Sequence, residues 1–380
     1  MNLEFTEDQK AVQRLARDFA EGEVRPRAPK WDASGEFPHD LIPKMAELGF
    51  MGLTIPEKYN GAGLDLVSAA LVIEEVAKAC GSVALTLASH NGLCSRHIFD
   101  FGSEDQRKKY LPDLASGKKL GAWALTEPGS GSDASGMRTR AVADKDGFTI
   151  NGSKAFITQG SVGHTYVILA STSPEKKQKG ITAFVMEKAT PGLKSGKPED
   201  KLGCRASDTA QLSLENVRVK KDQIVGEMDR GFIDTLKILD KGRIVIGAMA
   251  LGLGEAALAA SVRYAKEREQ FGKPISEFQA IQWKIANMAT ELEAARLLVY
   301  RAAFKQAKGE KTTLESAQAK LFASEAAIRA CNDAIQIHGG YGYIKEYPVE
   351  RYWRDAKLCE IGEGTSEVQR MVIAKHILGA

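Results

Sequence analysis

The spacing of hydrophobic residues changes twice along the 380-residue chain. Apolar residues recur every three or four positions up to about residue 117, which is typical of packed helices. Between about 118 and 226 they alternate with polar residues or form short runs, as in 165–170 and 181–186, which indicates strands. The helical spacing then returns and continues to the C-terminus. We therefore predict an α+β protein with an N-terminal all-α domain at 1–117, a middle β domain at 118–226 and a C-terminal helical domain at 227–380.

Local signals predict where some of these elements begin and end. The segment Thr6-Glu7-Asp8-Gln9 has the capping-box pattern of a helix start. Thr312-Thr313-Leu314-Glu315 repeats that pattern before a later helix. Asn151-Gly152 after Phe148-Thr149-Ile150 predicts a hairpin turn. One predicted helix carries an apolar stripe typical of an antiparallel bundle, formed by Phe278, Ile281, Ile285, Met288, Leu292, Ala295 and Val299. The next predicted helix carries Leu314, Leu321, Ile328 and Ile335.

Composition argues against several classes of protein. The net charge is only +3 and the one short basic run, 175–179, reads as a solvated loop, so nucleic acid is not an expected partner. The five cysteines are odd in number and form no Cys-x-x-Cys pair, which argues against disulfides and a zinc site and favours a reducing compartment. The N-terminus is acidic and no apolar run approaches ~18 residues, so we expect a cytoplasmic protein with no membrane span and no metal.

One carboxylate near the C-terminus stands out as a candidate base. Gly362 and Gly364 flank Glu363, and Thr365 then has the position of a cap for a helix with Val368, Met371, Val372 and Ile377 as apolar positions. Flanking glycines allow close approach of a ligand and leave Glu363 as the reactive group there. Glu363 equally suits the positive end of the helix dipole, and this loop alone leaves both interpretations open.

Four glycine-containing segments are candidate ligand-binding loops. The G-x-G-x-x-A match at 252–257 lies inside a helical pattern with no strand before it, so it predicts helix packing and no Rossmann unit. The segment 125–133 follows a predicted strand. Its glycines and hydroxyls could donate hydrogen bonds to a phosphate or a ring carbonyl, or the segment could be a plain turn. Arg268 in the loop 268–275 can grip a pyrophosphate, or form a surface ion pair. The segment 336–343 ends a helix with glycines, as a C-cap does, and also permits close approach to a cofactor.

Five segments taken together resemble the acyl-CoA dehydrogenase family in order and spacing, over essentially the whole chain: Leu125 to Asp133, Lys154 to Thr158, Arg268 to Ile275, Gln336 to Tyr343 and Glu363 to Glu367. The resemblance implies a helical N-terminal domain, a middle β-barrel or β-sandwich domain and a C-terminal four-helix bundle. It implies an oxidoreductase that holds FAD non-covalently and converts an acyl-CoA to the trans-2-enoyl-CoA. In that reaction Glu363 takes the α-proton while the β-hydrogen leaves as hydride to flavin N5.

The resemblance also assigns roles to individual positions. Residues implied beside the flavin or its phosphates are Trp123, Leu125, Thr126, Ser132, Phe156, Thr158, Thr365 and Glu367. Residues implied to hold the FAD of a neighbouring subunit are Arg268, Phe271, Gln279, Gln336, Gly339 and Gly340. Residues implied at the CoA thioester are Ser132, Asp240, Arg243 and Gly364. A shared FAD implies a homo-oligomer, usually a tetramer, and the expected electron acceptor is an electron-transfer flavoprotein.

Four positions bear on the substrate and on alternative functions. Gly242 stands where one branch of the family keeps its base, and Ala84 where glutaryl-type members have an arginine, which disfavours a dicarboxylate substrate. Gly362 replaces a tyrosine common in relatives, so we predict a branched, cyclic or otherwise bulky acyl group. Phe156 replaces a tryptophan and keeps an aromatic face. The same residues also suit an enoyl-CoA reductase running in reverse, an oxidase, or a flavin-loaded scaffold without turnover.

Overall fold

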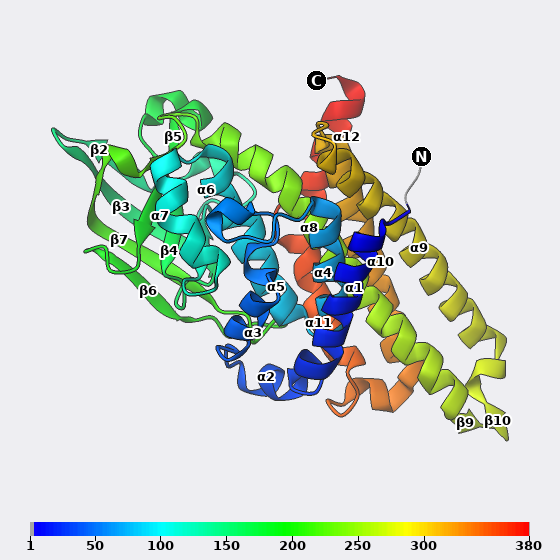
Figure 1. The fold of residues 1–380 in the computed structure, drawn as a ribbon. Helices are drawn as coiled ribbons and strands as arrows, with labels where there is room; N and C mark the ends of the chain where they lie inside the picture. The colour runs from blue at the N-terminus through cyan, green and yellow to red at the C-terminus, as the bar shows by residue number, and fades with distance from the viewer. Residues whose placement is uncertain (1–3, 380) are drawn as a thin grey trace.

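The N-terminal part of the chain is helical, as the apolar spacing predicted. The computed structural model describes residues 4–379 (Figure 1). The capping box forms at the start of α1, where Thr6 and Gln9 exchange hydrogen bonds between side chain and backbone. The helices of this part are α1 (Glu7–Phe19), α2 (Ala28–Ser34), α3 (Leu41–Glu47), α4 (Leu66–Ala79), α5 (Gly81–Ser89), α6 (Arg96–Phe101) and α7 (Glu104–Ala115).

The middle part is one eight-stranded sheet that encloses its own core. Its strands are β1 (Gly121–Ala124), β2 (Arg140–Ala143), β3 (Gly147–Thr158), β4 (Thr165–Ser171), β5 (Ile181–Glu187), β6 (Leu193–Pro198), β7 (Thr209–Lys220) and β8 (Ile224–Val225). The order is β6-β7-β3-β2-β4-β5-β8, and β1 pairs parallel with β4. Only Arg140 and Ser171 join β2 to β4. The two halves of the sheet fold over one cluster that includes Phe148, Tyr166 and Phe184.

The prediction of a hairpin turn at Asn151-Gly152 is wrong. Both residues lie inside β3, at a register shift against β7 between Ile150 and Gly152. The turn between β2 and β3 lies earlier, where the Asp144 carboxylate accepts hydrogen bonds from the N–H groups of Asp146 and Gly147. An Asn-Gly pair serves a β-bulge as well as a turn, since both need unusual backbone angles.

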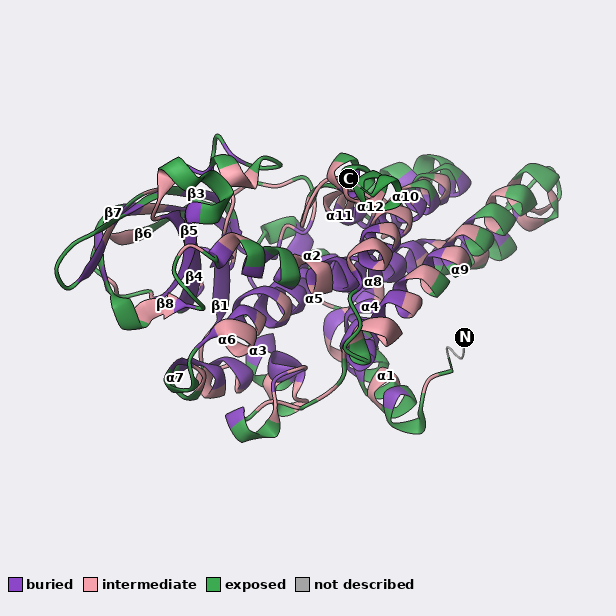
Figure 2. Cartoon of the chain, turned by 90° about the horizontal axis from the view of Figure 1, so that it is seen from above, coloured by how far each residue is buried: buried purple, intermediate pink, exposed green. Residues whose placement is uncertain are grey.

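The C-terminal part is a bundle around α8. Figure 2 shows buried residues concentrated in α8 and in α4 and α5 beside it, whereas α9 is exposed along much of its length. The elements are α8 (Gly231–Glu267), β9 (Glu269–Gln270), β10 (Lys273–Pro274), α9 (Gln279–Ala307), α10 (Thr313–His338), α11 (Val349–Ile361) and α12 (Ser366–Leu378). Helix α8 is long and apolar enough to cross a membrane, but 83% of that apolar window is buried inside the protein, as in a core helix.

The predicted helix at α10 forms, but the predicted capping box at its start does not. Thr312 precedes the helix but its hydroxyl donates to Gln306 Oε1, and Glu315 pairs with Lys305, so no capping box forms there. The second predicted stripe, Leu314 to Ile335, is only partly buried. Small residues fill the core face instead: Ala317, Ala319, Ala323, Ala326, Ala327, Ala330 and Ala334.

Glycines on α8 explain why small residues occupy this core. A Cβ at Gly254 would lie 2.4 Å from Leu292, and one at Gly252 would lie 2.3 Å from the carbonyl oxygen of Glu74. Helices approach closely where neither side carries bulk, so alanines face these glycines. The helix-packing interpretation of 252–257 is therefore confirmed.

A loop of the β part docks on α11, the helix that leads to Glu363. Arg354 on α11 donates to the carbonyl of Leu202, and the N–H of Cys204 donates to the carboxylate of Asp355. A Cβ at Gly203 would lie 2.2 Å from the carbonyl oxygen of Arg354. This backbone-to-backbone contact fixes the sheet against the bundle.

Replacing Gly203 with Ala should therefore destabilise the protein by about 1–3 kcal/mol, because a methyl group would press on backbone that cannot move aside. Urea unfolding measures this loss. Gly196→Ala is the matched control in β6, since its Cβ would have no neighbour closer than 3.6 Å. Equal stability of the two variants would show that the loop tolerates a methyl group.

Candidate active site

Glu363 lies on the turn between α11 and α12, as predicted. The Thr365 hydroxyl accepts a hydrogen bond from the N–H of Val368 and so caps α12. Glu363 and Gly364 both have positive φ, 54° and 96°. A non-glycine residue with positive φ is disfavoured, so the surroundings must hold this turn in place.

The Glu363 carboxylate rests against α8 at the bare backbone of Gly242. A Cβ at Gly242 would lie 1.9 Å from Glu363 Oε2. That oxygen is buried and has no hydrogen-bond partner among the residues that the structure describes. Burial raises the pKa of Glu363 to about 7, against the opposing effect of Arg243 and Lys320. A carboxylate with this pKa is a stronger base than an exposed one and still ionises near neutral pH.

Two of the predicted thioester contacts lie beside Gly242 on α8. Asp240 accepts hydrogen bonds from Arg243 Nη1 at 2.7 Å and from the Thr313 hydroxyl at 2.6 Å. Burial raises the pKa of Asp240 and lowers that of Arg243. Ser132 is exposed in the loop after β1 and makes no hydrogen bond to these groups within residues 4–379. The structure therefore brings Asp240 and Arg243 to the Glu363 turn, whereas Ser132 comes from the middle part of the chain.

Two buried residues that contact the turn were missed by the sequence analysis. Lys320 Nζ on α10 donates to the carbonyl of Gly364 at 2.8 Å. The side-chain amide of Gln369 on α12 donates to the carbonyls of Glu363 and Gly364 at 3.3 and 2.9 Å. Neither Lys320 nor Gln369 is exposed. The sequence signal that could have indicated Lys320 is that it is a single lysine within an alanine-rich helix face.

The predicted flavin residues of the middle part gather near β1 and β3. Phe156 is 68% exposed, with φ 57°, at a register shift of β3 against β7. Trp123 is buried and its Nε1–H donates to His97. Leu125, Thr126 and Thr158 are half-buried. An exposed aromatic ring on a strained bulge beside threonine hydroxyls fits one face of a flavin ring.

A buried ion pair fixes the loop that carries Thr126. Lys154 Nζ donates to the carbonyl of Leu125 and to Glu127, 2.8 Å away, and Glu127 accepts from the N–H groups of Arg138 and Thr139. Burial lowers the pKa of Lys154 to about 8.

Thr365 and Glu367 lie at the start of α12, where the helix N-terminus favours anionic ligands.

The second predicted cofactor group lies far from the first in the same chain. Figure 1 shows β9 and β10 at one end of the bundle, with the sheet on the opposite side of the molecule. Phe271, between these two strands, is 94% exposed. Arg268 lies over the ring of Tyr341, 5.6 Å from its centre, which joins this hairpin to the end of α10. The remaining members, all exposed, are Gln279, Gln336, Gly339 and Gly340.

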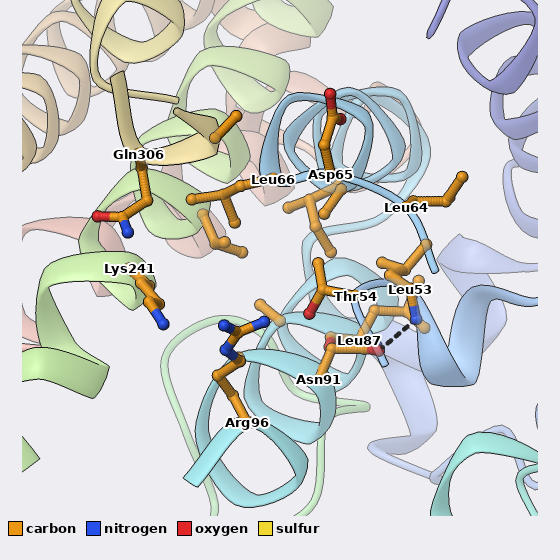
Figure 3. Close-up of a pocket in the computed structure, with 16 residues that line it drawn as sticks. Leu53, Thr54, Leu64, Asp65, Leu66, Leu87, Asn91, Arg96, Lys241 and Gln306 are labelled. Atoms are coloured by element: carbon orange, nitrogen blue, oxygen red, sulfur yellow. Dashed lines mark hydrogen bonds between the residues drawn. The ribbon is translucent and has the colours of Figure 1, made fainter. Parts of the chain in front are cut away.

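A separate cavity of about 200 Å³ lies between α4, α5, α8 and the end of α9 (Figure 3). Its wall is largely apolar, and Arg96 and Lys241 extend toward each other at one side. Both cations pair with Asp100. None of the predicted site residues lines this cavity.

Comparison with known proteins identifies the family. The family models described as acyl-CoA dehydrogenase N-terminal, middle and C-terminal domains match residues 6–118, 122–217 and 229–378. The chain belongs to the acyl-CoA dehydrogenase family. The predicted resemblance and the three-part α+β fold are thereby confirmed, as is its class as an oxidoreductase.

Individual relatives match this acyl-CoA dehydrogenase chain over nearly its whole length. A 3-(aryl)acrylate reductase of Clostridium sporogenes is 47% identical over 98% of this chain and 99% of its own. The butyryl-CoA dehydrogenase structure from Megasphaera elsdenii is 45% identical, with TM-score 0.97 over both whole chains. A chain of the structure described as the electron transferring flavoprotein of Acidaminococcus fermentans is 45% identical, with TM-score 0.98 over both whole chains.

Gly242→Ala should displace the Glu363 carboxylate without disturbing the fold, because the new methyl group meets the end of a flexible side chain. A shift of that size lowers turnover by on the order of 100-fold. Acyl-CoA turnover and melting temperature should be measured together. Gly22→Ala, which meets nothing within 4 Å, is the control; full activity of Gly242→Ala would contradict the placement of Glu363.

Glu363→Gln should stabilise the protein at pH 8 and not at pH 4.5. The raised pKa means that the folded state binds a proton more tightly than the unfolded chain, so stability falls as pH rises from about 4.5 to about 7. Glutamine does not titrate, and the gain at pH 8 is on the order of 2 kcal/mol. Unfolding at both pH values measures it, with the exposed Glu346→Gln as control. A gain of equal size at both pH values would contradict the assignment.

Proposed function

We propose that this protein is a FAD-dependent acyl-CoA dehydrogenase that desaturates a short, branched or cyclic acyl-CoA to the trans-2-enoyl-CoA, with Glu363 as the catalytic base. The observation that carries this proposal is the Glu363 carboxylate placed against Gly242, whose buried Oε2 has no hydrogen-bond partner within residues 4–379. Burial raises the pKa of this group to about 7. Family membership supplies the reaction class. A flavin-loaded scaffold without turnover would have no use for such a carboxylate.

The chain's own residues supply the proton transfer and its electrostatics. Glu363 takes the α-proton of the thioester, and its backbone N–H has no acceptor within 4–379, so it is free to donate to the thioester oxygen as negative charge develops there. Asp240, Arg243 and Gly364 hold the thioester end of the substrate, and Ser132 contacts it from the middle domain. Bound FAD would accept the β-hydrogen as a hydride at N5.

The acyl group is bulky on this proposal. The three atoms nearest to a Cβ at Gly362 all belong to Leu358, at 3.4 to 3.9 Å, so this position is loosely packed, and the absence of a tyrosine side chain leaves room for a bulky acyl group. The related 3-(aryl)acrylate reductase is named for a substrate with an aromatic ring. Ala84 is buried and supplies no cation for a second carboxylate, which speaks against a dicarboxylate.

A second candidate is an enoyl-CoA reductase that uses the same residues in reverse. The name of the Clostridium sporogenes relative favours it. The direction follows from the redox partner and not from the site, since Glu363 donates in reverse the proton that it removes in the forward reaction.

The proposed partners are an electron-transfer flavoprotein and further copies of this chain. The matched structure from Acidaminococcus fermentans supports the first. The separation of β3, which carries Phe156, from the β9–β10 hairpin, which carries Phe271, supports the second, because the two groups of cofactor residues suit one FAD only if they come from neighbouring chains. We propose a homotetramer in the cytoplasm, where the five buried thiols stay reduced.

Glu363→Gln tests the base directly. The variant should keep FAD and lose α-proton removal, lowering turnover by several orders of magnitude. Anaerobic titration with acyl-CoAs, followed by flavin absorbance, reports the loss and names the substrate class. Flavin that no saturated thioester bleaches, but that an enoyl-CoA reoxidises after chemical reduction, would favour the reductase. Full activity of Glu363→Gln would place the base elsewhere.

Gly362→Tyr tests the acyl pocket. Its kcat/KM should fall by on the order of 100-fold for branched, cyclic or aryl chains and change little for butyryl-CoA, because the ring occupies only the space that bulky groups need. The same panel of thioesters, used with wild type and variant, gives the comparison. An equal loss for every chain would contradict the substrate assignment.

A further inference from the structure

Lys320 is buried at a place where a lysine is costly. Its side chain has no exposed surface, makes one hydrogen bond within 4–379, and has no carboxylate within 4 Å. Burying an ammonium without an ion pair is unfavourable, and a methionine of similar shape would suit the alanine-lined core better. Packing alone therefore gives no reason for a lysine here.

The single hydrogen bond of Lys320 falls on the turn that presents Glu363. Its acceptor, the carbonyl of Gly364, is also held by Gln369 from α12. Glu363 and Gly364 both have positive φ, so the turn needs such external contacts to keep one conformation. Lys320 and Gln369 therefore donate hydrogen bonds to the same carbonyl from two different helices.

The charge of Lys320 also acts on the Glu363 carboxylate. The groups that face Lys320 are Glu363 on the turn, Cys359 and Glu360 on α11, and Arg243 on α8. Burial lowers the pKa of Lys320 to about 8, so it is mostly protonated at pH 7. The ammonium and Arg243 both lower the pKa of Glu363.

We infer that Lys320 is a positioning residue for the catalytic base: its ammonium fixes the Glu363–Gly364 turn through the Gly364 carbonyl, and its charge stabilises the ionised carboxylate. This inference rests on the proposed role of Glu363 as the base. The oriented turn places both the carboxylate and the N–H of Glu363 at the substrate.

Lys320→Met and Lys320→Gln separate the two contributions. Lys320→Met removes the hydrogen bond and the charge, so the rate of anaerobic flavin reduction by acyl-CoA should fall by on the order of 10–100-fold. The ascending limb of its pH–rate profile should move to higher pH, because Glu363 ionises less readily without the neighbouring cation. Lys320→Gln keeps a donor for the Gly364 carbonyl, and should recover much of the rate while its pH limb stays shifted.

Melting temperature distinguishes positioning from structural support. Both variants should melt at or above the wild-type temperature, because the cost of burying an ammonium is removed. Arg329→Met, an exposed cation on the same helix, is the control and should match wild type in rate, pH limb and melting temperature.

Two results would overturn the inference. One is an ascending limb of the pH–rate profile that stays at its wild-type position in both Lys320 variants. The other is a lower melting temperature combined with an unchanged rate in the folded fraction. Glu363→Gln belongs in the same series. Its retention of activity would instead overturn the proposed function, so the two failures are distinguishable.

Discussion

The contact between the Glu363 carboxylate and the backbone of Gly242 constrains the rest of the site. It exists only because α8 carries no side chain at that position, and it encloses the carboxylate enough to raise its pKa to about 7. An acid ionised near neutral pH inside a protein needs nearby cations that do not neutralise it by direct pairing. Arg243, tied to Asp240, and Lys320, tied to Gly364, meet that requirement.

The fold supplies this arrangement through close packing of small residues. Alanines on α10 meet glycines on α8, so the backbones approach, and a lysine among the alanines reaches the turn beyond them. The loop around Gly203 fixes the sheet to α11, and α11 ends one residue before Gly362. The position of the base therefore depends on contacts in both the middle and the C-terminal parts of the chain.

The sequence predicted the three parts, the position of Glu363 on a turn and the Thr365 cap, because each rests on local periodicity or local hydrogen bonding. It misplaced the hairpin at Asn151, because pairing with β7 decides where a bulge lies. It misjudged Thr312, because the hydroxyl finds Gln306 rather than its own helix. Lys320 and Gln369 were missed for a related reason: polar residues are ordinarily assigned to the solvent face, and only the tertiary structure shows what surrounds them.

The exposed hairpin that carries Phe271 has a consequence for how the proposed holoenzyme behaves on dilution. With one half of each cofactor site on a neighbouring chain, FAD affinity depends on protein concentration as well as on FAD concentration. The fraction of chains that lose their cofactor would then rise as the protein is diluted, so a colourless dilute preparation reports dissociated chains and not unfolded ones.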